Sequence, residues 1–391
     1  MQALLFAAIA LVSCAASTPK DQAVEEVQPS ASSYEFGELH IWPTVDTTDA
    51  FNTEAIACLR RFCTKKVHPE ETNDYWYTPD LERFGGIQAE LLYAEFDSLG
   101  DPRYPPTLMS IRETGVPDQR LLTVRWAKMD SSGVAERVRY VFDFLARGTA
   151  EGVRLGSPLD HTTQQWERKR FGTVEYIISP QHAFSEQQAR QQLADIDRLS
   201  RFFELPTFPI HFYSCTDPTE LFRMHGYQQH PLMHVFPTGG RAEGTDIVYS
   251  GNNKDVYTHE VVHLFSSRKF GERPWVLDEG MATLLAGSNE YDFTWHRANL
   301  KRYLEEEPDV DLVAICATYD PTYINEHTNV AYAIGGVLCE LMLRRKGKEG
   351  LFKALAAGAD LWPALEPYDV ARRTLRSELI KELALEPLVI P

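Results

Sequence analysis

One nine-residue segment limits the local fold of this chain more than any other. It runs from Tyr257 to Phe265 and carries His259, Glu260 and His263 in the spacing His-Glu-x-x-His. On an α-helix, residues four apart differ by only about 40° around the axis, so both imidazoles leave the same face. Glu260 would lie about 100° round from His259. The segment therefore predicts a helix that presents two imidazoles on one face, with a carboxylate beside them.

The residues around this segment predict where the helix begins and ends. Asn252 and Asn253 precede it and are candidate N-caps, while Gly271 and Pro274 follow it and are expected to close it. Two imidazoles at this spacing are a zinc-binding pattern, but the five-residue motif also arises by chance, in about one chain in a hundred of this length. A third ligand is needed before a metal site is predicted.

Glu279 is the candidate third ligand. It stands sixteen residues after His263, in the string Trp-x-x-x-Glu-Gly-x-Ala that begins at Trp275 and opens an apolar helix. The intervening loop allows the chain to return toward the imidazoles. Two histidines and one glutamate form a set that suits Zn²⁺ and leaves a fourth position for water.

Together the two motifs resemble those of the gluzincin zinc metallopeptidases, and especially the peptidase MA-like family. The resemblance covers about residues 168–355 and includes a later Tyr-Ala-x-Gly-Gly segment that begins at Tyr332. It implies one zinc ion per chain, held by His259, His263 and Glu279. It also implies Glu260 as the general base and Tyr332 as the group that stabilises the oxyanion, with Tyr319 and Tyr323 as alternatives to Tyr332.

Two departures from the family pattern restrict which class of gluzincin peptidase is expected. Thermolysin-like members carry an acidic residue four positions after the ligand Glu, whereas this chain has Thr283, so the partner of a ligand histidine must come from elsewhere. Aminopeptidase members carry Gly-x-Met-Glu-Asn before the metal helix, and the corresponding segment 244–251 lacks it. An endopeptidase is therefore favoured. We expect a substrate strand to pair with the edge of the strand predicted at 246–249.

Hydrophobic periodicity predicts an α+β protein of two domains. Residues 34–167 are expected to form an accessory domain of helices followed by a curved antiparallel sheet, an order that resembles the NTF2-like cone. Residues 168–391 are expected to form the gluzincin-like domain, a small sheet followed by mostly helices. The predicted helices are 51–65, 80–84, 87–96, 185–203 with Ser185 as N-cap, and 218–224. The predicted strands are 107–113, 121–127, 138–145, one near Val153, 172–179, 209–213 and 246–249.

The N-terminus carries a ten-residue apolar run from Ala3 to Val12. Spanning a bilayer takes about 20 apolar residues, so this run fits a signal-peptide core instead. The Leu-Val-Ser-Cys sequence that ends at Cys14 resembles a bacterial lipobox, although residues 1–10 lack Lys and Arg. We expect a signal peptide over 1–14, a lipid on Cys14 that anchors an exported cell-envelope protein, and a flexible tether over 15–33. Plain export and a cytosolic chain are the alternatives.

The net charge of the chain limits the classes of partner that are expected. The formal net charge is −17, so phosphate backbones should repel the chain and nucleic acid is not expected as a partner. Membrane contact is expected through the N-terminal anchor only.

Five cysteines remain besides Cys14, an odd number that favours buried free thiols over complete pairing. His225, His230 and His234 form a second histidine group, but Gly226 and Pro231 between them favour a loop.

Two functions from different classes fit these observations. The first is a zinc-dependent peptidase that hydrolyses peptide bonds of a peptide or protein substrate, with Glu260 as general base. The alternative is a lipid-anchored binding or assembly protein whose peptidase-like domain holds zinc without catalysis. Glu260 favours the enzyme, because a structural zinc site has no use for a base and usually closes with a fourth protein ligand.

Overall fold

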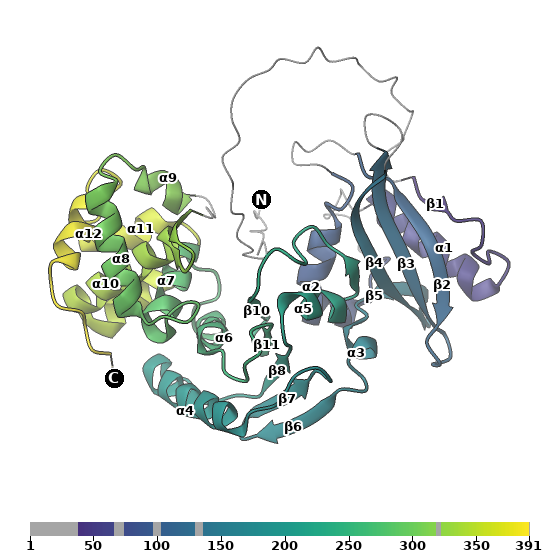
Figure 1. The fold of residues 1–391 in the computed structure, drawn as a ribbon, viewed down its shortest axis with the longest axis horizontal. Coiled ribbons are helices and arrows are strands. Elements are labelled where there is room, and N and C mark those ends of the chain that lie inside the picture. The colour runs from purple at the N-terminus through teal and green to yellow at the C-terminus, as the bar shows by residue number, and fades with distance from the viewer. Residues whose placement is uncertain (1–37, 66–73, 97–102, 130–135, 318–321, 391) are drawn as a thin grey trace, which may run out of the picture. The chain divides into compact units, whose positions relative to one another are not determined.

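The computed structural model describes residues 38–65, 74–96, 103–129, 136–317 and 322–390. Within them, helices and sheets occur in both halves of the chain, which confirms the predicted α+β class (Figure 1). Cys14, the tether 15–33 and Tyr319 lie outside the described residues. None of the described helices is both long enough and apolar enough to cross a membrane.

The chain divides into two compact units, which we call unit 1 and unit 2. Unit 1 consists of the residues up to Glu167 together with Ser179–Gln181 and Cys215–Gly239, and unit 2 consists of Arg168–Ile178, His182–Ser214 and Gly240–Pro391. The sequence analysis assigns all residues after 167 to the second domain, whereas two later segments belong to unit 1. The longer of these segments contains β9, whose pairing with β4 of unit 1 cannot be read from its local sequence pattern.

Unit 1 is built on a largely antiparallel sheet in the strand order β1-β2-β3-β4-β5, with β9 also paired to β4. Its elements are β1 (His40–Ile41), α1 (Ala50–Lys65), α2 (Thr78–Leu91), β2 (Pro106–Glu113), β3 (Gln119–Met129), β4 (Glu136–Thr149), β5 (Gly152–Gly156), α3 (Leu159–Thr162), α5 (Pro218–Met224) and β9 (Tyr227–Gln229). As predicted, α1 and α2 precede the main strands β2 to β5, although the two-residue strand β1 comes before α1. The core gathers aromatic rings, with Phe144 of β4 in edge contact with Phe62 of α1 and with Trp76.

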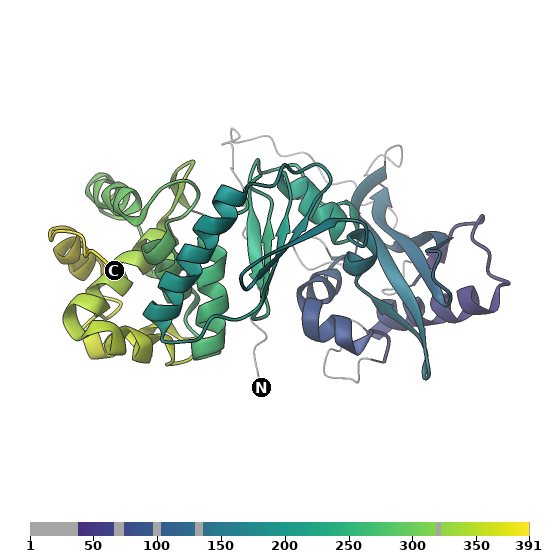
Figure 2. The same cartoon turned by 90° about the horizontal axis from the view of Figure 1, so that it is seen from below.

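Unit 2 begins with a five-stranded sheet in the order β10-β11-β8-β7-β6. Its strands are β6 (Glu167–Phe171), β7 (Val174–Ile178), β8 (Ile210–Ser214), β10 (Gly240–Glu243) and β11 (Ile247–Ser250). Strands β7, β8 and β11 run parallel, and β10 is antiparallel to β11. Alternate residues of these strands, among them Tyr176, Phe212 and Val248, are fully buried in one core with α4 (Glu186–Phe203) and α6 (Thr258–Phe270). Figure 2 shows α4, in teal, beside this sheet.

Strand β10 corrects one prediction. The sequence analysis places the open edge of the sheet at 246–249, but β10 pairs with β11 there and forms the edge itself. The segment Arg241-Ala242-Glu243 has neither β-branched nor aromatic residues, so its pattern predicts no strand. Main-chain hydrogen bonds to β11, across a turn at Gly244 with φ +60°, create it instead.

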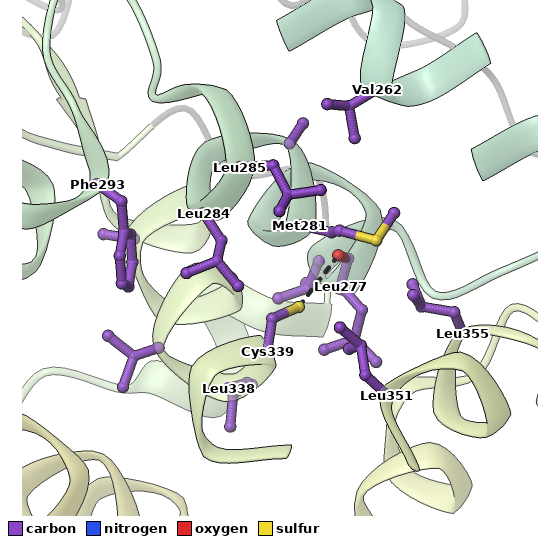
Figure 3. Close-up of a cluster of buried hydrophobic side chains, with 14 of the residues drawn as sticks. Val262, Leu277, Met281, Leu284, Leu285, Phe293, Leu338, Cys339, Leu351 and Leu355 are labelled. Atoms are coloured by element: carbon purple, nitrogen blue, oxygen red, sulfur yellow. Dashed lines mark hydrogen bonds between the residues drawn. The ribbon is translucent and has the colours of Figure 1, made fainter. Parts of the chain in front are cut away.

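The rest of unit 2 is mostly helical, as predicted. After α6 come α7 (Trp275–Ala286), α8 (Phe293–Glu306), α9 (Leu312–Ala317), the short strands β12 (Tyr323–Asn325) and β13 (Thr328–Asn329), α10 (Val330–Leu355), α11 (Leu361–Leu365), the 3₁₀ turn η1 (Glu366–Tyr368) and α12 (Leu375–Leu383). Figure 3 shows the shared core of these helices, in which Met281 of α7 lies near Val262 of α6 and Leu351 of α10. Cys339 of α10 bonds through its thiol to Leu277 O at 3.5 Å.

Helices α7 and α10 approach each other closely through glycine. A Cβ placed on Gly280 would lie 2.0 Å from the carbonyl carbon of Gly335, and one placed on Gly335 would lie 2.0 Å from Val276 O. Only glycine allows this distance between backbones. The contact explains why glycine follows Glu279 in the first motif and recurs in the later Tyr-Ala-x-Gly-Gly segment.

The cysteines agree with the sequence prediction. Among the described residues, Cys58, Cys63, Cys215, Cys316 and Cys339 are all buried and all free. They behave as small apolar side chains of the two cores.

Candidate metal centre

The helix that carries the His-Glu-x-x-His motif is α6, and its first turn is held by α4. Tyr257 is the N-cap and makes no side-chain cap, so the prediction that Asn252 or Asn253 caps this helix is wrong. Instead, Tyr257 N donates to Gln192 Oε1 at 2.6 Å. Thr258 Oγ1 donates to Asp195 Oδ2 at 2.8 Å. The helix ends at Gly271 with φ +67°, as predicted.

The structure brings the three predicted metal ligands together. The rings of His259 and His263 lie 5.1 Å apart between centroids. Glu279 stands in the first turns of α7, and its Oε2 lies 3.2 Å from His259 Nε2 and 3.4 Å from His263 Nε2. One ligand atom from each of the three residues lies within 4.8 Å of the others. The motif spacing and the loop after Gly271 therefore produce the convergence that the sequence predicts.

The second ring nitrogen of each histidine is also fixed. His259 Nδ1 donates to Gly287 O at 2.7 Å, and His263 Nδ1 donates to Asp278 Oδ2 at 3.0 Å. Both acceptors can only accept, so each Nδ1 carries a proton. Each Nε2 faces Glu279 and is the nitrogen that could bind a metal ion once it has lost its own proton. Two imidazole nitrogens and one carboxylate oxygen, oriented in this way, fit the donor set of a zinc ion with one open position.

Asp278 is a site residue that the sequence analysis missed. Besides His263, its carboxylate accepts from Ser266 Oγ at 2.7 Å and pairs with Arg273 Nε at 2.7 Å. It thus supplies the acidic partner that Thr283, fully buried on the same helix, cannot supply. The adjacent pair Asp278-Glu279 could have revealed it, since neighbouring helical residues are about 100° apart and can reach different nitrogens of one ring.

The electrostatics of the cluster favour a cation between these groups. Burial alone would lower the pKa of His263, but the charges of Asp278 and Glu279 and their hydrogen bonds outweigh it and raise the pKa well above its ordinary value. Burial would raise the pKa of Glu279, but the charge of His263 and the hydrogen bonds from both imidazoles lower it to about 2. The carboxylates are therefore ionised and stabilise positive charge at this place.

Glu260 lies beside the ligands and is not one of them. It is 8% exposed, and its Oε2 accepts a hydrogen bond from Ala242 N of β10 at 2.7 Å. The predicted general base is thus held between the metal helix and the edge strand.

Tyr332 lies over the ring of the first ligand. It stands in the first turn of α10, where Asn329 is the N-cap and its Oδ1 accepts from Tyr332 N at 3.2 Å. The Tyr332 and His259 rings stack with centroids 6.1 Å apart and an interplanar angle of 16°. The close α7–α10 contact through Gly280 and Gly335 fixes this position. Tyr323 is half-buried in the β12–β13 hairpin, where it pairs with Asn329.

The second histidine group is not brought together as a metal site. His230 Nε2 pairs with Glu90 in unit 1, and its Nδ1 accepts from Leu232 N at 3.0 Å. Its ring also stacks on Phe222, with centroids 4.2 Å apart. The one group in the described part of the chain that is arranged to hold a metal is His259, His263 and Glu279.

The candidate centre thus rests on side-chain geometry and on the two sequence motifs. The predicted ligands lie on α6 and α7, the predicted general base lies on α6, and Tyr332 lies on α10. No protein-family model matches the chain, and no curated protein sequence matches it significantly.

Proposed function

We propose that this protein is a zinc-dependent peptidase of the gluzincin type, which hydrolyses internal peptide bonds with Glu260 as general base. The observation that carries the proposal is the convergence of His259 Nε2 and His263 Nε2 on Glu279 Oε2, at 3.2 and 3.4 Å. The hydrogen bonds of both Nδ1 atoms to fixed acceptors support it, because they leave the Nε2 atoms to bind metal.

Each residue of the cluster has a role in this proposal. His259, His263 and Glu279 would hold one zinc ion. When bound, zinc supplies Lewis-acid chemistry, which lowers the pKa of a water molecule and polarises a carbonyl group. Glu260 accepts the proton of the attacking water and returns it to the leaving amine. Asp278 and the Gly287 carbonyl keep the imidazoles in their orientation.

Tyr332 is the group proposed to stabilise the oxyanion. Its ring stacks on that of His259. In this proposal its phenol donates a hydrogen bond to the oxyanion that forms when the polarised carbonyl is attacked. Donors of this kind contribute about 2.7 to 4 kcal/mol to the transition state in other enzymes. Tyr332→Phe should therefore lower kcat while it leaves zinc content unchanged.

The edge strand β10 is the proposed place for the substrate backbone. Ala242 N points away from β11, because it donates to Glu260. In an antiparallel pair both main-chain groups of such a residue face the same side, so Ala242 O also faces away from β11. Because Ala242 N already donates to Glu260, a substrate N–H that donates to Ala242 O would bring the substrate backbone next to the proposed general base.

A structural zinc site is the competing function. Such sites usually close with four protein ligands. The metal-binding group in the described residues contains three. The three-ligand set, together with a carboxylate next to it that ligates nothing, supports turnover over a purely structural role.

Zinc content and hydrolysis test the proposal together. Purified protein should retain about one zinc ion per chain after mild dialysis and should cleave an unfolded protein substrate. Glu260→Gln should abolish cleavage and retain zinc, whereas Glu272→Gln, an exposed carboxylate after α6, should change neither. Zinc without any cleavage by the wild-type protein would support the binding-protein alternative. Absence of zinc would contradict both functions.

A further inference from the structure

We propose that His296 is a positioning residue for the metal centre, because it fixes the loop whose carbonyl group orients the proposed zinc ligand His259. The inference rests on the proposed function and deepens it, since it extends the centre to a residue outside the ligand set and outside the two motifs. His296 lies on α8, on the far side of that loop from α7.

The carbonyl group that orients His259 belongs to the short loop between α7 and α8. Nδ1 of His259 donates to Gly287 O at 2.7 Å. Gly287 has φ +76°, and a Cβ placed on it would lie 2.1 Å from Tyr291 O, so the loop needs glycine there. Two backbone hydrogen bonds close the loop, from Ser288 N to Tyr291 O at 3.1 Å and from Tyr291 N to Ser288 O at 3.2 Å. The orientation of the His259 ring therefore depends on where this loop lies.

His296 binds the loop through the carbonyl group next to that of Gly287. Its Nε2 donates to Ser288 O at 2.9 Å, and the residue is only 1% exposed. A carbonyl oxygen can only accept, so Nε2 carries a proton. Burial lowers the pKa of His296 from its ordinary value, which keeps the ring neutral at neutral pH. His296 therefore donates through Nε2, whereas His259 donates through Nδ1.

The other nitrogen of His296 faces the hairpin that precedes α10. Because Nδ1 of the neutral ring carries no proton, it accepts from the hydroxyl of Thr328 at 3.0 Å. Thr328 is fully buried in β13 and directly precedes Asn329, the N-cap of α10. His296 thus joins the loop between α7 and α8 to the start of the helix that carries Tyr332.

A second contact holds the same loop against the hairpin. Asn289, with φ +54°, donates through Nδ2 to His327 O at 2.6 Å. Asn289 is exposed, so water competes for this hydrogen bond. The bond from His296 is made by a buried ring, where a hydrogen bond is stronger and its loss costs more. We therefore assign the main role in holding the loop to His296.

The position of the loop matters because a ligand imidazole is oriented by the hydrogen bond at its second nitrogen. For His263 that acceptor is a side chain, Asp278. For His259 it is a main-chain carbonyl, which no substitution can remove. His296 is the side chain through which the position of this carbonyl can be tested. It acts through Ser288 and Gly287 and contacts no proposed ligand atom.

Two substitutions of His296 separate its two hydrogen bonds. A Gln side chain reaches the position of Nε2 and can still donate to Ser288 O, whereas an Asn side chain reaches only the position of Nδ1. We expect His296→Asn to lower zinc affinity about ten-fold and His296→Gln to retain the wild-type affinity. Competition with a chromophoric chelator for Zn²⁺ measures both. Equal affinities in wild type and His296→Asn, or an equal loss in both variants, would overturn the inference.

Leu304→Ala is the control for a general loss of stability. Leu304 lies on the same helix and is buried in the core of unit 2, away from the loop. Its truncation should lower the unfolding midpoint and leave zinc affinity unchanged at a temperature where the protein stays folded. A loss of affinity in Leu304→Ala as large as in His296→Asn would overturn the inference, because zinc binding would then merely follow stability.

Cleavage assays on the wild-type protein distinguish failure of this inference from failure of the proposed function. If the wild type binds zinc but cleaves no unfolded substrate, the proposed peptidase has failed, and the zinc affinities of the two His296 variants still decide the role of His296. If the wild type binds no zinc, both the proposed function and the inference are overturned.

Discussion

The carboxylate of Asp278 accepts a hydrogen bond from Nδ1 of His263 at 3.0 Å, and the next residue along the chain offers its own carboxylate to Nε2 of the same ring. Two consecutive residues of α7 therefore hold the imidazole from both sides. Ser266 and Arg273 in turn hold Asp278. The orientation of His263, the second proposed ligand, is set by α7 as much as by the helix that carries it.

Asp278→Asn should weaken zinc binding. The amide oxygen can still accept from His263, but the negative charge that balances the imidazole and Arg273 is lost. We expect zinc affinity to fall about 10- to 100-fold, measured by competition with a chromophoric chelator. Asp309→Asn, which changes an exposed carboxylate after α8, serves as control and should bind zinc like the wild type. Equal affinities for the two variants would contradict the role of Asp278.

Gly280→Ala should destabilise unit 2 and disturb the site. The added methyl group would overlap the Gly335 backbone and force α7 and α10 apart. Overpacking of this kind costs about 1 to 3 kcal/mol, which chemical unfolding can measure. Because Glu279 and Tyr332 lie on the separated helices, cleavage should fall as well. A Gly280→Ala protein with wild-type stability and activity would show that the close contact is not needed.

The stability of the protein should depend on pH through the carboxylate of Glu378. Hydrogen bonds from Lys381 and Arg345 lower the pKa of this carboxyl below its ordinary value. The pKa of Glu378 is lower in the folded protein than in the unfolded chain. Its contribution to the free energy of unfolding is therefore complete above about pH 5 and is lost as pH falls through the folded pKa. Glu378→Gln should therefore be about 1 kcal/mol less stable than wild type at pH 7, and the difference should shrink below about pH 4.

Urea unfolding across this pH range measures the effect. Glu349→Gln, an exposed carboxylate on α10, is the control and should follow the wild type throughout. A Glu378→Gln difference that stays constant from pH 7 to acid would show that charge at this position does not contribute.

Cys14 predicts attachment to the membrane. In a bacterial host, the full chain should incorporate labelled palmitate and sediment with membranes, and Cys14→Ser should abolish both. The expectation follows from the lipobox-like end of the apolar run. A wild-type chain that takes up no label and stays in the soluble fraction would show that Cys14 carries no lipid anchor.

Local patterns predicted much of the fold and the core of the site. The helical spacing of α1, the β-rich runs of β3 and β4, and the Ser185 N-cap of α4 are all found in the structure. The three ligands were predictable because a helix fixes the relation of His259 to His263. Their convergence with Glu279 then needed only a short loop.

Features that depend on distant partners were not predicted. Strand β10 has a polar sequence and exists because β11 lies beside it. The first turn of α6 is held by Gln192 and Asp195, which lie more than sixty residues away in the chain. The same holds for the ring of Tyr257, which lies against β10 because residue 240 is glycine. Local periodicity carries no information about such contacts.

His259, His263 and Glu279 are proposed to hold a zinc ion whose fourth position is open. Anomalous diffraction at the zinc edge, from crystals of the zinc-loaded protein, locates the ion. We expect one strong peak per chain, about 2.0 to 2.2 Å from both Nε2 atoms and from a Glu279 carboxylate oxygen, with Glu260 close by but not bonded to the metal. A peak elsewhere, or a fourth protein side chain in the open position, would contradict it.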